Sequence, residues 1–408
     1  MKALFVPSMS QLRDPAFLIE QFDQVIARAP RYLGCSSAMT KHAPRYVSAF
    51  TNDAHVLLRD KDGVVGAFLN SCRHRNGQIV PVGMVVDGKL IARQGKVLQN
   101  GNIMCPWHRW AYSGTDGSLI HAPTFRGEGM LCAQKNKLHT VPLEEFEGLF
   151  FEAGKDVASQ LSPVMESPGF KKFGIIPFRF GHRMSLFRSE SANESFHTVT
   201  FMEVFGDTDH VDDIHKDSFD QLVDMNSLFL EYGAHYSVQF VGWREETTTV
   251  CDEYDDYRRQ VLLRGGVPKY GAVWMAYGPN MTFEWYPLGL DKHGEEQHAF
   301  VVSVCVPDGI KSKTVVEFFF PESVLAAESD EHPGIVRALY AAYNVTVEED
   351  RFLVNSMENG RRTLVAEGKG SDLIGPAHAH QEGCVTHYWN LLGGYLEDIK
   401  PTSELVVA

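Results

Sequence analysis

The first 42 residues carry apolar side chains at roughly helical spacing. The stretch DPAFLIEQFDQVIARAP has the pattern of a helix with one buried face. The apolar residues of this face are Phe17, Ile19, Phe22, Val25 and Ile26. We therefore expect residues 1–42 to form a helical segment that packs on the larger domain of the chain.

Residues 43–155 have a different pattern, made of short apolar and β-branched runs separated by turn sequences. The runs are AHVLLRD, VVGAFLN, KLIARQ and GLFFEA, and the turn sequences are KDG, VDG, QNG and TDG. Aspartate or asparagine followed by glycine favours the tight turns that connect antiparallel strands. This pattern predicts a small all-β domain.

Residues 156–408 combine longer strand-like runs with helical ones. The segment PVMESPGF at 163–170 contains two prolines and a glycine, so it is predicted to be a linker. The runs HYSVQFVGW, AVWMAYG, MTFEWYPL and AFVVSVCVP alternate with helical patterns around 202–222, 252–264 and 347–362. The predicted fold class is α+β, with an antiparallel sheet flanked by helices.

The composition limits the partners of this chain. Its 408 residues include 38 Lys and Arg against 52 Asp and Glu, which gives a net charge of −14. Because binding to nucleic acid requires a basic surface, a nucleic-acid partner is not expected. No run approaches the roughly 18 apolar residues of a membrane span, and the first residues lack a secretory core. We expect a cytoplasmic protein that acts on a small molecule, without a membrane partner.

Two of the seven cysteines lie beside histidines. The cysteines are scattered and odd in number, which argues against a disulfide framework. CRHRN at 72–76 and CPWHRW at 105–110 each offer one thiolate and one imidazole, ligands that suit zinc or an iron–sulfur cluster. Zinc sites usually keep the cysteines in one half and the histidines in the other, so the mixture favours a [2Fe-2S] cluster, with zinc as the alternative. The four candidate ligands are Cys72, His74, Cys105 and His108.

CRHRNG together with CPWHRWAYSGTDGSL resembles the cluster-binding loops of the Rieske non-haem iron oxygenases, the alpha subunits of terminal oxygenases. The resemblance implies that Cys72 and Cys105 bind the inner iron, and that His74 and His108 bind the outer one. It also implies three parts: an N-terminal segment at 1–42, a Rieske domain at 43–155 and a helix-grip catalytic domain at 156–408. The stretch VPVGMVVDGKLIARQGKVLQNG between the two loops is longer than is usual in the family and predicts an extra hairpin.

An oxygen-activating non-haem Fe(II) site requires two histidines and a carboxylate on one face. FMEVFGDTDHVDDIHKDSF offers Asp207, His210 and His215 in the order DxxHxxxxH. In an ideal helix His210 and His215 would point about 140° apart, so a helix break between them is predicted. Taken alone, the segment also fits a solvated acidic helix.

The third ligand is sought in NVTVEEDRFLVNSMENGRR at 344–362. At helical spacing Asp350 shares an apolar face with Val347, Val354 and Met357, where a bare carboxylate would be costly to bury. Glu349 is the second candidate, and an exposed helix is the alternative. The family has the same DxxHxxxxH and acidic patterns. The resemblance implies that His210, His215 and Asp350 bind the iron, and that Asp207 links His210 to His108 of a neighbouring subunit.

The resemblance implies a terminal oxygenase that uses O₂ and electrons from outside. The sequence contains no GxGxxG after a strand and no plant-type ferredoxin motif, so it is not expected to take electrons from NADH by itself. A separate NAD(P)H-dependent reductase, with or without a ferredoxin, is therefore expected. The resemblance further implies a homotrimer, with or without a small β subunit.

Family members hydroxylate aromatic rings, remove methyl groups, or oxidise quaternary ammonium compounds such as choline and betaines. We expect an aromatic substrate, with a quaternary ammonium compound as the alternative. Aromatic residues of AVWMAYGPNMTFEWYPL are candidates for the pocket lining: Trp274, Tyr277, Trp285 and Tyr286. A zinc-stabilised binding module without catalysis is the alternative from a different class of protein.

Overall fold

A computed structural model describes residues 6–397 except for 15, 40–44, 61, 82–84, 87–88, 91–95, 98–100, 124–134, 179–183, 292, 328–333 and 376. The chain forms two compact units, and the smaller is built around residues 31–158. This unit begins earlier than residue 43, the boundary predicted from sequence. The reason is a long-range pairing, because β1 (Tyr32–Cys35) is antiparallel to β13 (Leu149–Glu152).

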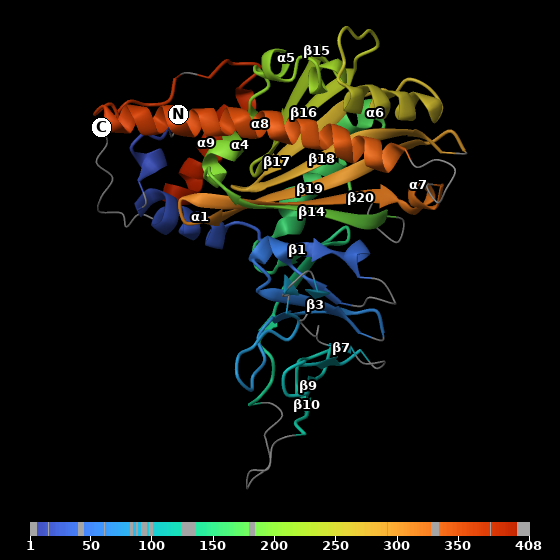
Figure 1. Cartoon of the computed structure of the whole chain (residues 1–408), viewed down its shortest axis with the longest axis vertical. Coiled ribbons are helices and arrows are strands. Elements are labelled where there is room, and N and C mark those ends of the chain that lie inside the picture. Colours follow the sequence, from blue (N-terminus) through green and yellow to red (C-terminus); the bar gives the residue numbers. More distant parts are fainter. Residues whose placement is uncertain are drawn as a thin grey trace. The chain divides into compact units, whose positions relative to one another are not determined.

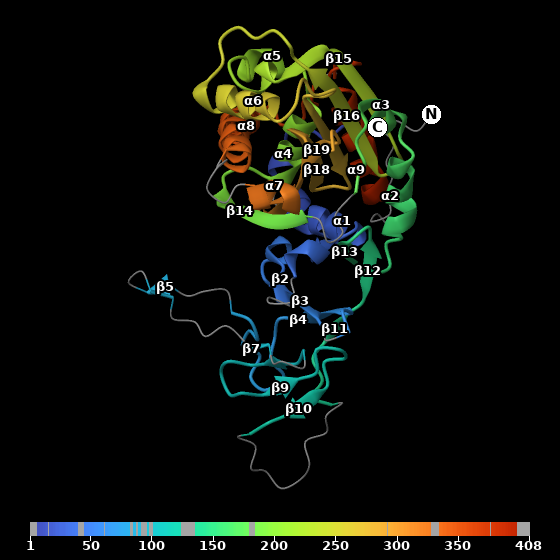
Figure 2. The same ribbon diagram turned by 90° about the vertical axis from the view of Figure 1, so that its right-hand side faces the viewer.

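The smaller unit consists of short antiparallel strands, as predicted (Figure 2). One sheet has the order β1-β13-β12, with β12 at Leu143–Phe146. A second sheet has the order β11 (Thr140–Val141), β4 (Val65–Leu69), β3 (His55–Arg59) and β2 (Arg45–Val47). A third has the order β10 (Leu119–His121), β9 (Ala111–Tyr112), β8 (Ile103–Met104) and β7 (Lys96–Val97).

The extra hairpin predicted between the two Cys/His loops is present. Its strands are β5 (Val85–Val86) and β6 (Lys89–Leu90), which pair antiparallel. The core of the smaller unit packs residues of the second and third sheets, such as Phe68 and Tyr112, around Cys72 and Cys105. The two cysteines are therefore inside the domain rather than on its surface. Cys132 lies outside the described residues, and the other six cysteines are all free thiols.

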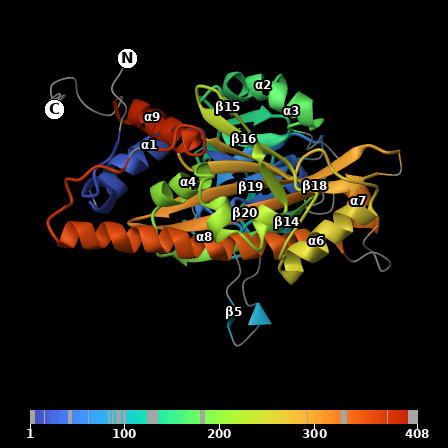
Figure 3. The same cartoon turned by 90° about the horizontal axis from the view of Figure 1, so that it is seen from above.

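The larger unit is built on a seven-stranded antiparallel sheet (Figure 1). In order across the sheet, its strands are β14 (Met184–Glu194), β20 (Lys311–Pro321), β19 (Glu296–Asp308), β18 (Met281–Leu290), β17 (Ala272–Tyr277), β16 (Tyr236–Trp243) and β15 (Val223–Tyr232). The long helix α8 (Ile335–Ala366) and α6 (Asp252–Leu263) pack on one face (Figure 3). Together with α7 (Glu322–Ala327), these elements give the α+β helix-grip arrangement predicted from sequence.

The opposite face of the sheet is covered by α2 (Val157–Met165) and α3 (Pro168–Phe173). The prediction of a linker at 163–170 is therefore wrong. Pro168 opens α3, where a missing N–H costs nothing, and the Ser167 hydroxyl accepts a hydrogen bond from the Phe170 N–H. A Cβ atom at Gly169 would lie 2.5 Å from the Phe240 ring, so glycine allows α3 to pack closely on the sheet.

The N-terminal segment is helical and packs on the larger unit. Its elements are η1 (Gln11–Arg13), η2 (Ala16–Gln21) and α1 (Phe22–Arg28). Of its apolar face, Phe17, Phe22 and Val25 are buried against α4 (Thr198–Gly206) and α9 (Gly383–Glu397). None of the described helices has both the length and the hydrophobicity needed to cross a bilayer.

Candidate metal centres

The two Cys/His loops have the same backbone form. Cys72 follows β4 and Cys105 follows β8, and each cysteine N–H donates to the carbonyl five residues later. The N–H groups of Asn76 and Arg109 donate to the carbonyls of Cys72 and Cys105, respectively. Both Asn76 and Arg109 have a positive φ, of 57° and 60°. Each loop therefore presents its cysteine from the interior and its histidine toward the outside.

The four side chains form a thiol pair and an imidazole pair. Cys72 and Cys105 are 2% and 1% exposed, and the interaction with the Cys105 thiol lowers the pKa of Cys72. The rings of His74 and His108 lie 4.6 Å apart at 88°, and His108 is exposed. The buried Nδ1 atom of His74 has no hydrogen-bond partner within the described part of the chain.

The separation of the four side chains into a cysteine pair and a histidine pair favours a two-iron cluster over zinc. Ligand atoms of one tetrahedral zinc ion lie within about 4 Å of one another. Across the described residues, no three of these four donors come within 4.8 Å of one another, whereas two cysteines on one iron and two histidines on the other fit the observed pairs. The buried thiols and outer imidazoles also agree with the inner and outer irons expected from the sequence.

Tyr112 is expected to tune this cluster. Its hydroxyl oxygen lies 3.1 Å from the Cys72 sulfur and 3.1 Å from the Arg73 nitrogen, which donates to it, so its proton is free to point at the sulfur. Hydrogen bonds to ligand sulfur favour the reduced cluster. Tyr112→Phe is expected to lower the reduction potential by about 40 mV, which corresponds to about 1 kcal/mol for one electron. Protein-film voltammetry measures this shift, and an unchanged potential would show that the hydroxyl does not act on the sulfur.

The second group of metal-binding side chains forms around a single helical turn. α4 ends at Gly206, the backbone of Asp207 is extended, and α5 (Val211–Ile214) lies between His210 and His215. The Ile214 and His215 N–H groups bond to residues 210 and 211, so the predicted break between the histidines is wrong. The break comes before His210. The helical turn does not extend before His210 or after His215. The two imidazole rings can therefore turn toward each other, and their centroids lie 5.2 Å apart.

Asp350 on α8 completes the group. Its Oδ1 atom lies 3.5 Å from His210 Nε2 and 3.0 Å from His215 Nε2, and donor atoms of all three residues lie within 4.8 Å of one another. Burial would raise the pKa of Asp350, but the hydrogen bonds from His210 and His215 lower it to about 2. A carboxylate and two imidazoles converging at this spacing fit one non-haem iron, with the remaining coordination positions open.

Carboxylates also contact the far sides of both imidazoles. Glu349, the second candidate for the third ligand, lies 2.7 Å from His215 Nδ1 and accepts a 2.6 Å hydrogen bond from Ser218. Asp207 lies 3.3 Å from His210 Nδ1. Such contacts orient a ligand histidine and raise its basicity. Glu349 and Asp207 are therefore placed to support the two histidines rather than to join Asp350.

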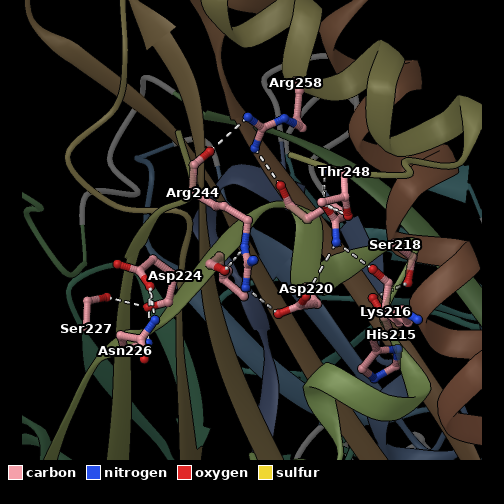
Figure 4. A network of polar contacts seen from close by, with 12 residues as sticks. His215, Lys216, Ser218, Asp220, Asp224, Asn226, Ser227, Arg244, Thr248 and Arg258 are labelled. Carbon is pink, nitrogen blue, oxygen red and sulfur yellow. Dashed lines mark hydrogen bonds and ion pairs between the residues drawn. The ribbon is translucent and has the colours of Figure 1, made fainter. Parts of the chain in front are cut away.

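The chain after His215 is fixed by a polar network (Figure 4). Arg258 donates to the carbonyls of Gln221 and Arg244 at 2.6 and 2.8 Å, and the Gln221 amide donates to the carbonyl of Lys216 at 2.7 Å. Arg244 forms a 2.7 Å ion pair with Asp220. The turn that carries His215 is thereby attached to α6 and β16, so its imidazole does not depend on a mobile loop.

A cavity of about 300 Å³ opens beside His210, His215 and Asp350. Trp274 and Tyr286 line it, whereas Tyr277 and Trp285 do not, which corrects the predicted set. Side chains alternate between the two faces of a sheet, and Trp274 pairs with Glu284, so residue 285 must face the other way. Trp285 instead donates to the Pro177 carbonyl and packs on Phe170.

Sequence reasoning missed Glu284 and Tyr343, which also line this cavity. Glu284 is 4% exposed, and Tyr343 on α8 donates to it over 3.1 Å. A signal was available, because MTFEWYPL has a single charged residue within a mostly apolar strand. The strand register needed to place that residue on the cavity face was not available from sequence.

Comparisons with known proteins show similarity in the Rieske domain and over nearly the whole chain. Residues 32–142 match the family model of the Rieske [2Fe-2S] domain. The chain is 29% identical over 396 residues to a putrescine 2-hydroxylase of Ralstonia nicotianae, with 94% of each chain covered. It has the fold of the quaternary ammonium Rieske monooxygenase whose structure concerns carnitine oxidation and inter-subunit electron transfer (TM-score 0.68, 15% identity, 96% and 95% covered). It also has the fold of naphthalene 1,2-dioxygenase from Rhodococcus (TM-score 0.65, 15% identity, 95% and 93% covered).

The fold, the Rieske domain and these relatives identify the chain as a Rieske oxygenase of the alpha-subunit type. It is thus an oxidoreductase that reacts with O₂. Enzymes of this class carry a Rieske [2Fe-2S] cluster and a mononuclear iron, and the two groups of side chains described above fit these cofactors.

Proposed function

We propose that this chain is the terminal component of an oxygenase system and hydroxylates, or oxidatively demethylates, a small amine. The observation that carries the proposal is the convergence of His210, His215 and Asp350 on one side of a cavity of about 300 Å³. Iron held by these three residues would supply the activation of O₂. The cavity beside these three side chains would hold the substrate next to the iron.

Electrons enter through the exposed histidine of the cluster in this proposal. His108 is exposed next to Trp107, which is 54% exposed, so a reductase or ferredoxin has a surface to approach. We further propose that Asp207, 3.3 Å from His210, bridges His210 to His108 of a neighbouring subunit in a homotrimer, so that electrons pass between the two histidines across this side chain. The description of inter-subunit electron transfer in the carnitine-oxidising relative supports this arrangement.

The relatives and the charge of the cavity both favour an amine. The putrescine 2-hydroxylase that matches 94% of the chain acts, by its name, on an aliphatic diamine. Besides the exposed Glu348, the cavity lining contains four carboxylates, Glu194, Asp207, Glu284 and Asp350, against one guanidinium, that of Arg351. An aromatic substrate is the second candidate, supported by the edge-to-face pair of Phe219 and Trp274 in the cavity wall, with ring centroids 5.6 Å apart.

Asp207→Ala tests the electron route. The variant is expected to keep both metal centres while substrate oxidation falls on the order of a hundredfold or more, because the link between His108 and His210 is removed. Turnover is measured as O₂ uptake and product formed from a panel of aliphatic amines, betaines and small arenes, with a surrogate reductase and NADH. The mononuclear iron is counted in the same samples.

The neighbouring exposed carboxylate Asp209 provides the matched control. Asp209→Ala removes a charge two residues away without touching His210, and near-parental turnover is expected. If Asp207→Ala retains coupled oxidation, the proposed route through this side chain is wrong. If the parent enzyme oxidises no member of the panel and binds no mononuclear iron, the oxygenase proposal itself fails.

A further inference from the structure

Glu284 is a buried carboxylate at the floor of the cavity, on the face of the sheet that α8 covers. It is 4% exposed and accepts hydrogen bonds from Tyr286 at 2.7 Å and Tyr343 at 3.1 Å. The Ser303 hydroxyl lies 3.4 Å away and also donates to it. Glu284 therefore has a built polar environment, made of hydroxyl groups from β18, β19 and α8.

No positively charged side chain balances Glu284 in the described part of the chain. All of its hydrogen-bond donors are neutral hydroxyl groups. Arg351, the guanidinium of the cavity lining, is engaged by Glu194 and Glu348. Burial raises the pKa of Glu284 to about 7, although the Tyr286 and Tyr343 hydroxyls lower it. An ionised carboxylate in such a place is costly unless a cation reaches it.

We infer that Glu284, with the hydroxyl groups of Tyr286 and Tyr343, binds a protonated primary or secondary ammonium group of the substrate. The inference rests on the proposed function, since it takes this cavity to be the substrate site. The Trp274 side chain lines the same cavity and pairs with Glu284 across β17 and β18, so it offers an aromatic wall for the alkyl chain. Glu284 would thus fix one end of the substrate and present the chain to the iron site.

The acceptor oxygens of Glu284, Tyr286 and Tyr343 favour an ammonium group that carries N–H bonds over a quaternary one. A primary ammonium has three N–H donors, and the carboxylate and the two tyrosine oxygens can accept from them. A quaternary ammonium has none and is held mainly by aromatic faces. A neutral arene would leave the carboxylate buried without a counter-charge. The site therefore selects against both the quaternary ammonium and the neutral arene.

Binding to the iron-loaded enzyme under argon tests this inference without requiring turnover. Isothermal titration calorimetry is used with 1,4-diaminobutane, n-butylamine, tetramethylammonium, benzene and 1,4-butanediol. The parent is expected to bind the diamine and the monoamine more tightly than the other three. Glu284→Gln is expected to weaken binding of both amines by about 30-fold or more. Tyr343→Phe removes one acceptor and is expected to weaken it several-fold.

Glu348→Gln is the matched control, since Glu348 also lines the cavity but is 68% exposed and paired with Arg351. A change of less than about threefold is expected there, because exposed charges are screened by solvent. The melting temperature of Glu284→Gln is expected to equal or exceed that of the parent, whereas a purely structural carboxylate would lower it on replacement.

The inference is overturned if Glu284→Gln binds the diamine within threefold of the parent, or if Glu348→Gln loses as much affinity. It is also overturned if the parent prefers tetramethylammonium or benzene. Those results would leave the proposed oxygenase intact if turnover of another substrate is observed. Conversely, an enzyme that binds amines through Glu284 but never consumes O₂ would contradict the proposed function and leave the inference about Glu284 standing.

Discussion

Asp350→Ala is expected to abolish substrate oxidation and to leave the [2Fe-2S] cluster in place. Within the described part of the chain, Asp350 is the one carboxylate that contacts both His210 and His215, and two neutral imidazoles alone hold ferrous iron poorly. Iron should fall from roughly three to roughly two atoms per chain, while acid-labile sulfide stays at about two. Product formation should drop on the order of a thousandfold or more. Metal analysis and coupled O₂ uptake measure both effects.

Glu349→Gln provides the comparison, because Glu349 is adjacent in sequence and also contacts His215. It lies on the far side of that imidazole, at Nδ1, so the variant is expected to bind iron about 10- to 100-fold more weakly yet remain active when iron is supplied. The opposite result, in which Asp350→Ala keeps its iron and Glu349→Gln cannot be restored, would assign the carboxylate ligand to Glu349.

The metal-binding residues could be predicted because each motif lies within one short stretch of the sequence. The two Cys/His loops and the DxxHxxxxH stretch each fit within a few residues. Helical periodicity together with the acidic pattern of the family favours Asp350 over Glu349. The structure brings Asp350 to His215 across 135 positions of sequence, a closure that only the fold provides. The residues were therefore predictable while their distances were not.

Errors arose where pairing between distant segments decides the structure. Tyr277 and Trp285 are predicted to line the pocket because they are aromatic residues of one hairpin, but the face of a strand residue depends on the register with its neighbour. The start of the small domain was placed too late because β1 pairs with a strand more than 100 residues away. The prolines of 163–170 suggest a linker, but Ser167 and Pro168 begin the helix α3.

The contacts of Glu203, in the helix that precedes His210, also could not be predicted from the local sequence. It was part of the acidic stretch that suggested a solvated helix, yet it is 4% exposed and ion-paired with Arg361 of α8. Arg361 also donates to the Thr200 hydroxyl at 2.7 Å, and Thr200 donates to Glu358, which is paired with Arg13. This network joins the N-terminal segment, α4 and α8, so it holds α8 against the helix that leads into the histidines.

Arg361→Ala is expected to destabilise the larger unit by about 3–5 kcal/mol at pH 8, since it leaves the buried Glu203 without its cation. The melting temperature should fall by roughly 10 °C or more. Burial raises the pKa of Glu203 to about 7 even with Arg361 opposing it, so removing Arg361 raises this pKa further. An acid whose folded-state pKa is raised loses stability as pH rises above its unfolded value, so the deficit of the variant should be smaller at pH 5.5 than at pH 8.

Calorimetric scans at the two pH values distinguish this effect from a general loss of packing. Adding Glu203→Gln to Arg361→Ala removes the stranded charge and should recover part of the loss at pH 8 but little at pH 5.5. Arg259 is the matched control, because it forms two ion pairs on α6 at 3.0 and 3.2 Å while 55% exposed, and Arg259→Ala should leave the melting temperature unchanged. A deficit for Arg361→Ala that is the same at both pH values would mean that the arginine contributes through packing of its alkyl chain, and that it does not act by balancing Glu203.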